Sequence, residues 1–258
     1  MANKIEKQFL DTKNKGPVRL NKYLSEAGVC SRREADKLIA AGQVTVDGVR
    51  AETGMKVEPW QVVRIGKKQV SRQEEMIVLV VNKPRGIVCT EERRERDSIV
   101  RFLNYPVRIT YVGRLDKDSE GLLLMTNNGD IINRMMRAAN KHEKEYKVTV
   151  DKPVTDEFLK EMAGGVPILD TVTRPCQVEK LGKYKFKIIL TQGLNRQIRR
   201  MCEALGYEVK ELRRVRIMNI ELGNLKPGEY RKVTDQELNE LYELIRDSKS
   251  EPTPWNNN

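Results

Sequence analysis

The chain has 258 residues, which is long enough for one large domain or two unequal ones. Its 48 Lys and Arg residues exceed its 37 Asp and Glu residues and give a formal net charge of +11. Such a surplus favours a polyanionic partner, either nucleic acid or an anionic membrane surface. The longest apolar run, 76–81, is far shorter than the roughly 20 residues needed to cross a bilayer, so we exclude a membrane-spanning protein.

Cysteine and histidine usage restricts the possible chemistry. Four cysteines lie far apart without a C-x-x-C pair, and the charged N-terminal segment lacks the apolar core of a secretory signal. We therefore expect reduced thiols in a cytoplasmic protein. The single histidine, His142, rules out a two-histidine metal site, and we expect it to be solvated. Any catalysis would then use carboxylate, tyrosine, lysine or arginine side chains.

The first part of the chain predicts a small helical and β-hairpin module at 16–66, after a disordered segment at 1–15. Apolar residues recur with helical spacing over 19–27, and Ser31 with Glu34 forms a capping box that opens a second helix ending at Gly42. An Asp47-Gly48 turn predicts a hairpin over 44–49, and a further strand covers 62–65.

A polar linker at 67–75 is expected to lead into a larger domain at 76–248, followed by a disordered tail at 249–258. Strands and helices are interspersed in this domain, which predicts an α+β fold with a mostly antiparallel sheet. The expected strands are 76–81, 122–125, 145–150 and 184–190, and the expected helices are 131–136, 156–162, 198–205 and 234–245.

The run from Gly113 to Leu123 is the most informative part of the sequence. Asp116 and Asp118 stand two residues apart after Arg114, so an extended backbone would place all three on one face. A carboxylate beside a guanidinium can stay ionised in a dry site, as a nucleophile or base requires. The alternative for an isolated D-x-D pattern is a charged loop with local salt bridges.

The whole run resembles the G-R-L-D-x-x-[ST]-x-G-L signature of RNA pseudouridine synthases. Two further blocks are similar to the same family, 143–146 (EKEY) and 193–201 (GLNRQIRRM), and N-K-P-x-G at 82–86 is a structural landmark of it. The resemblance implies that Asp116 is the catalytic aspartate, that Tyr146 packs against the target base, and that Arg199 forms an ion pair with Asp116. Without the resemblance, a tyrosine on a strand such as Tyr146 would be interpreted as a core residue.

The resemblance extends from about 18 to 245 and is to the RsuA/RluB/RluF group of bacterial rRNA synthases, with local sequence most similar to the RluF branch. It implies isomerisation of uridine in a stem-loop of 23S rRNA, with tRNA as a further possible substrate, by a monomer. Arg114 would fill the space left by a flipped base, and Asn195, Arg196 and Arg200 would contact RNA.

The first module resembles the S4 RNA-binding domain. In that family the second helix and its flanking loop lie against RNA, which makes a set of basic residues candidate phosphate contacts: Arg19, Lys22, Arg32, Arg33 and Lys37. The alternative is an ordinary solvated helix face.

Two other functions stay open from the sequence. One is a non-catalytic RNA-binding or ribosome-assembly factor with an inactive synthase domain. The other is an RNA N-glycosylase that releases uracil. Intact Asp116, Tyr146 and Arg199 argue against the first, and release of free base would identify the second.

Overall fold

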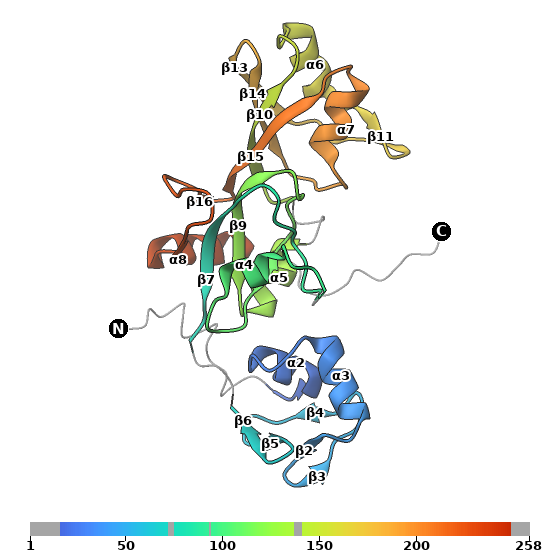
Figure 1. Cartoon of the computed structure of the whole chain (residues 1–258), viewed down its shortest axis with the longest axis vertical. Helices are drawn as coiled ribbons and strands as arrows, with labels where there is room; N and C mark the ends of the chain where they lie inside the picture. The colour runs from blue at the N-terminus through green and yellow to red at the C-terminus, as the bar shows by residue number, and fades with distance from the viewer. Residues whose placement is uncertain (1–15, 72–74, 93, 137–140, 249–258) are drawn as a thin grey trace. The chain divides into compact units, whose positions relative to one another are not determined.

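A computed structural model describes residues 16–71, 75–92, 94–136 and 141–248. The segments expected to be disordered, 1–15 and 249–258, lie outside these described residues. The chain divides into two compact units (Figure 1). The first contains residues up to Ile77 together with 105–110 and 126–129, and the second contains the remainder. In the described part of the chain, no helix is both long and apolar enough to cross a membrane.

The first unit is built from two short helices and a small sheet. Helices α2 (Leu20–Glu26) and α3 (Arg32–Ala40) follow the predicted apolar spacing, and Ser31 and Glu34 form the predicted capping box. The sheet has the order β3-β2-β5-β6, and β1 pairs with β4 separately. The strands are β1 (Val18–Arg19), β2 (Val44–Val46), β3 (Val49–Arg50), β4 (Lys56–Val57), β5 (Val63–Ile65) and β6 (Lys68–Val70).

Two predictions for this unit have different outcomes. The Asp47-Gly48 hairpin is confirmed, because both residues have positive φ, 51° and 82°, as the predicted tight turn requires. The linker predicted at 67–75 is wrong for its first part, because β6 pairs with β5 and Val70 joins the buried core. The run Lys67-Lys68-Gln69 is polar because it lies at the sheet edge.

The second unit contains a nine-stranded sheet, with its main path in the order β13-β14-β10-β15-β9-β7-β17. The β10–β14, β10–β15, β13–β14, β15–β16 and β7–β17 pairs are antiparallel, whereas β9 and β15 are parallel. This confirms the mostly antiparallel α+β prediction. The strands are β7 (Val78–Lys83), β8 (Thr110–Val112), β9 (Glu120–Thr126), β10 (Lys144–Val150), β13 (Gln177–Gly182), β14 (Lys185–Leu190), β15 (Val209–Ile217), β16 (Ile220–Glu221) and β17 (Tyr230–Lys232). A separate hairpin joins β11 (Pro167–Ile168) to β12 (Thr171–Val172).

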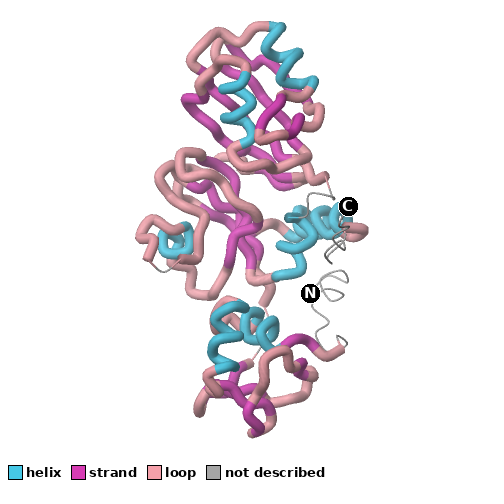
Figure 2. The backbone as a smooth tube through the Cα atoms, turned by 90° about the vertical axis from the view of Figure 1, so that its right-hand side faces the viewer, coloured by secondary structure: helices cyan, strands magenta, loops and turns pink. Residues whose placement is uncertain are grey.

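Helices cover the sheet of the second unit. Helices α6 (Asp156–Gly164) and α7 (Gln197–Ala204) share one core with β10, β14 and β15, in which the Phe158 and Phe186 rings meet edge to face at 5.3 Å. Strands β7 and β9 are almost wholly buried. Figure 2 shows helices on both sides of these central strands. The remaining helices are α4 (Ile99–Leu103), α5 (Gly129–Met136) and α8 (Asp235–Ile245).

Candidate active site

The segment Gly113–Ser119 is a short loop that joins β8 to β9. Gly113 begins it at φ 75°, and Leu115 anchors it by burying its side chain. The loop is tied to the landmark at 82–86, since the Gly86 amide donates to the Lys117 carbonyl at 2.7 Å. Within the loop the Ser119 amide donates to the Asp116 carbonyl at 3.1 Å, and both aspartates are half-buried. The landmark therefore supports the aspartate loop.

Asp116 and Asp118 share a group of arginines from α7. Arg196 Nη1 lies 3.7 Å from Asp116 Oδ2, and both terminal nitrogens of Arg196 donate to Asp118 at 3.1 Å. Burial raises the pKa of Asp118, but the hydrogen bonds from Arg196 and the charges of Arg199 and Arg196 outweigh it and place the pKa below its usual value. Asp118 is thus an arginine partner, which is one of the roles that the sequence allowed.

The predicted ion pair between Arg199 and Asp116 is not formed in the described structure, where Arg199 pairs with Asp118 instead. Arg199 Nε lies 3.4 Å from Asp118 Oδ2, and its Nη2 donates to the Asp118 carbonyl and to Ser119 Oγ at 3.0 and 3.3 Å. Its Nη1 donates to the Val209 carbonyl at 3.2 Å. Arg199 lies one helical turn beyond Arg196, where it reaches the underside of the loop rather than Asp116.

Arg196 reaches both aspartates from an unusual backbone conformation. It is the N-cap of α7 with φ 50° and ψ 34°, in the left-handed region that few residues other than glycine adopt. The buried side chain of Gln197 supports the turn by accepting a hydrogen bond from the Leu194 amide at 3.1 Å. Strained residues of this kind concentrate at functional sites, where the surrounding structure enforces them.

Strand β10 supplies the side of the site that faces the aspartates. Alternation along the strand separates Glu143 and Glu145 from Lys144 and Tyr146. Arg216 holds both glutamates, with 3.1 Å to Glu143 and 3.0 Å to Glu145. Lys144 and Tyr146 are thereby presented to a cavity on the other face.

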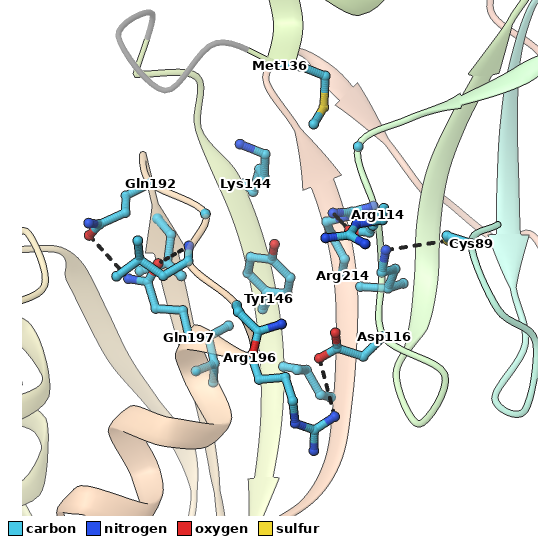
Figure 3. Close-up of a pocket in the computed structure, with 18 of the residues that line it drawn as sticks. Cys89, Arg114, Asp116, Met136, Lys144, Tyr146, Gln192, Arg196, Gln197 and Arg214 are labelled. Carbon is cyan, nitrogen blue, oxygen red and sulfur yellow. Dashed lines mark hydrogen bonds and ion pairs between the residues drawn. The ribbon is translucent and has the colours of Figure 1, made fainter. Parts of the chain in front are cut away.

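This cavity has a volume of about 460 Å³ and is bordered by the aspartate loop, β10, β15 and the segment leading into α7 (Figure 3). Figure 3 shows Tyr146, Asp116, Arg114 and Arg214 around it, with the Arg196 ion pair to Asp116 at one end. Basic side chains outnumber the single lining aspartate, so an anionic or electron-rich ligand is favoured.

Two lysines near the cavity have lowered pKa values. Burial, with the charge of Arg214 adding to it, lowers the pKa of Lys144 to about 8. Burial also lowers the pKa of Lys83 to about 8, although Cys89, Asp116 and Asp118 oppose the shift. The Lys83 ammonium donates to the Pro84 and Ile87 carbonyls and so stabilises the turn at 82–86.

His142 is not solvated, contrary to the prediction. It is buried beside the cavity, where its Nε2 lies 3.1 Å from the Arg134 carbonyl and 3.2 Å from Ser248 Oγ. Burial lowers the pKa of His142. The prediction relied on the polar residues next to His142 in the sequence, whereas its hydrogen-bond partners come from α5 and from the residues after α8.

The other predicted RNA-binding residues occupy varied positions. Arg114 and Asn195 line the cavity, whereas Arg200 bonds the Asn195 carbonyl at 3.2 Å. In the first unit, four of the five predicted phosphate contacts are exposed: Arg19, Arg32, Arg33 and Lys37. The fifth, Lys22, is half-buried and pairs with Glu26 at 3.5 Å.

Sequence reasoning missed Arg214, which is 2% exposed and lines the cavity. Three arginines occur in the stretch 213–216, and the sequence does not say which one faces inward. The four cysteines are free thiols, as predicted. In the part of the chain that the structure describes, no three His, Cys, Asp or Glu side chains cluster as metal ligands would.

Comparison with known proteins identifies the family. The family model for RNA pseudouridylate synthase matches residues 77–204, and the S4 domain model matches 18–73. The dual-specificity RNA pseudouridine synthase RluF of Escherichia coli (strain K12) is 54% identical over 239 residues, which cover 92% of this chain and 82% of that protein. The chain belongs to the RNA pseudouridine synthase family.

Other members of the family agree with this assignment. An uncharacterised RNA pseudouridine synthase of Mycobacterium tuberculosis is 36% identical over 242 residues, covering 88% of this synthase and 94% of the relative. A crystal structure of a pseudouridylate synthase, at 30% identity, superposes with a TM-score of 0.64 over 87% of this synthase and 99% of that chain. RNA is therefore the substrate of this synthase, and its reaction converts uridine to pseudouridine.

Proposed function

We propose that this synthase isomerises one uridine, or a few, in a stem-loop of 23S rRNA, with Asp116 as the catalytic carboxylate and no cofactor. The observation that carries the proposal is the position of Asp116 in a cavity of about 460 Å³, beside Arg196 and across from Tyr146. A volume of this size lies within the roughly 300–1,000 Å³ of small-ligand sites, so it suits a single flipped nucleotide. Similarity to the RNA pseudouridine synthase RluF supports an RNA substrate.

The reaction needs one carboxylate and no redox partner. The bond between N1 of uracil and C1′ of ribose breaks, and the ring keeps the electron pair. The ring then turns and forms a bond from C5 to C1′, after which C5 loses its proton and N1 gains one. Asp116 acts either as the nucleophile at C1′ or as the base that removes the adjacent sugar proton.

Tyr146 and the arginines have separate roles in the proposal. The Tyr146 ring stacks on the flipped base, and its hydroxyl exchanges the proton that moves between C5 and N1. Arg196 pairs with Asp116 at 3.7 Å and so positions its carboxylate at the cavity. Arg199 holds the loop from below through Asp118 and Ser119, and so acts as a positioning residue.

We propose that both units of the chain bind RNA. A base inside a stem must leave its stack at a cost of a few kcal/mol, and Arg114 at the cavity wall is placed to fill the space that it leaves. The exposed basic residues on α3, together with Arg19 before α2, contact phosphates at a distance from the reaction. We propose that the synthase acts as a monomer in the cytoplasm, where rRNA is modified.

Mapping pseudouridine in rRNA and tRNA from cells with and without this protein tests the proposal. We expect one or a few 23S sites to lose pseudouridine in its absence and to regain it when the protein is restored. Loss of a tRNA site alone, with every 23S site retained, would refute the rRNA assignment. Abasic sites together with free uracil would instead identify an N-glycosylase.

A further inference from the structure

Arg214 is a buried cation in the cavity for which the proposed mechanism has no role. It is 2% exposed, and no carboxylate among the described residues lies within ion-pair distance of it. Its Nε donates to the Leu122 carbonyl at 2.7 Å, and its Nη1 makes a long contact of 3.4 Å to the Arg114 carbonyl. Burying a charge without a counter-charge is costly, so its retention needs a reason.

One nitrogen of the guanidinium is unsatisfied. Nη2 of Arg214 is buried and has no hydrogen-bond partner among the described residues. Two contacts hold the other nitrogens, so the group cannot turn to satisfy Nη2 without breaking them. Nη2 is thus an unsatisfied, buried donor on a residue that lines the cavity.

The fold places this donor beside the base-stacking residue. Arg214 and Tyr146 are partners in the β10–β15 register, and the guanidinium carbon lies 6.0 Å from the centre of the Tyr146 ring. A base that stacks on Tyr146 would present its polar edge near the guanidinium. The ribose and phosphates stay with the RNA strand at the mouth, where the exposed side chains of Arg114 and Arg196 are available to them.

We propose that Arg214 is a further catalytic residue, which donates a hydrogen bond from Nη2 to a carbonyl oxygen of the flipped uracil. When the glycosidic bond breaks, the ring leaves with the bonding electrons, and its negative charge spreads onto its two carbonyl oxygens. A fixed guanidinium beside one of them stabilises that charge more than it stabilises the neutral uridine, which is the requirement for catalysis. The proposal deepens the proposed reaction and rests on Asp116 chemistry in the same cavity.

Neighbouring residues support this assignment. Burial lowers the pKa of Lys144, and the charge of Arg214 adds to that shift, so the two cations lie close enough to repel each other. Gly121 lets β9 approach β15 at this point, since a Cβ there would lie 2.2 Å from the Arg214 carbonyl oxygen. The backbone is thus built to hold Arg214 where it lies.

The test compares the effect of Arg214→Gln on two leaving groups. Single-turnover rates are measured on an RNA that the synthase converts, made with uridine or with 5-fluorouridine at the target, by disappearance of the N-linked nucleoside. Fluorine makes the departing ring more acidic and less dependent on stabilisation. We expect Arg214→Gln to slow the uridine reaction by about 10²–10³-fold, as removal of an oxyanion donor does. The penalty with 5-fluorouridine should be at least tenfold smaller.

Two controls keep this experiment decisive. Arg213→Gln changes the neighbouring residue, which pairs with Glu120 at 3.8 Å outside the cavity, and it should leave both rates within about threefold of wild type. Arg214→Lys keeps the charge and should show an intermediate penalty with the same dependence on the leaving group. Thermal melting checks that each variant is folded.

Equal penalties on the two RNAs would refute the inference, because a structural role slows both reactions alike. Weaker RNA binding with an unchanged single-turnover rate would also refute it and would assign Arg214 to a phosphate. The choice of 23S rRNA is judged separately: failure on a 23S stem-loop rejects that target, while the rate comparison uses whichever RNA is converted.

Discussion

Gly121→Ala tests the close approach of β9 to β15, which brings Gly121 against the backbone of Arg214. The added Cβ would lie 2.2 Å from the carbonyl oxygen and 2.7 Å from the amide nitrogen of Arg214, both in the backbone of β15. Neither atom can move without separating β9 from β15. Gly121 also has φ 107°, a conformation that alanine rarely adopts.

The cost of Gly121→Ala follows from these two terms. Strained backbone contributes about 1–3 kcal/mol, and overpacking contributes about 1–3 kcal/mol more. We therefore expect a decrease in stability near 4 kcal/mol, which corresponds to a melting temperature lower by about 8–16 °C for a domain of this size. The rate should also fall, because Arg214 and the aspartate loop are displaced together.

Thermal melting followed by circular dichroism measures the effect. Gly164→Ala is the matched control, since that exposed helical glycine has no atom within 4 Å of an added Cβ and no positive φ. It should melt at or slightly above the wild-type temperature, because alanine favours a helix by about 0.5–1 kcal/mol. If Gly121→Ala melts within about 1 °C of wild type, the close approach of β9 and β15 is incorrect.

Three further predictions concern RNA binding and catalysis. Tyr146→Phe should bind substrate RNA normally yet form little pseudouridine, because the ring still stacks and only the proton-exchanging hydroxyl is removed; a wild-type rate would make Tyr146 a packing residue. The pKa of Lys144 is lowered to about 8, so RNA affinity should fall as the pH rises through 8 and this lysine loses its charge. The Lys144→Arg variant stays charged and should show no such fall. If its pH profile of RNA affinity matches that of wild type, Lys144 is not the group that titrates. Replacing Arg32, Arg33 and Lys37 by glutamine should reduce the slope of log affinity against log salt by about 0.7–0.9 for each phosphate that these side chains neutralise. The rate on saturating RNA should be retained. An unchanged slope would place α3 away from RNA.

Local signals in the sequence were sufficient for most helices and for the hairpin. Ser31 with Glu34 forms the predicted capping box, and Thr234 with Glu237 forms another at the start of the predicted C-terminal helix. Such boxes can be read from the sequence because they depend on residues three apart in the chain. The apolar runs that became β7 and β9 were recognised for the same reason. Such features need no knowledge of distant partners.

Strand β15 escaped prediction although it lies at the centre of the sheet. Register shifts against β10, between Glu145 and Tyr146 and between Thr149 and Val150, change which residues face inward. The buried positions of 209–217 therefore do not alternate, and one of them is the arginine at 214. A bulge interrupts the period of two on which strand prediction depends.

The sequence also did not predict which arginine pairs with which aspartate. The family signature singled out Arg199 and Asp116, but the left-handed N-cap at Arg196 brings that residue to both aspartates instead. Nothing in the letters GLNRQIRRM specifies a positive φ at a non-glycine residue. The sequence thus predicted several residues that line the cavity, including Asp116, Tyr146 and Arg196, whereas their pairing required the backbone.

The most direct test of the central claim is a single-turnover assay of Asp116→Asn on unmodified 23S rRNA, with pseudouridine mapped at each position and RNA affinity measured in parallel. The substitution removes the charge of the carboxylate and keeps its shape, so phosphate contacts should survive. We predict that wild-type protein forms pseudouridine at one or a few sites, and that the variant binds within a few-fold of wild type but forms none. Substantial pseudouridine formation by Asp116→Asn would contradict the account.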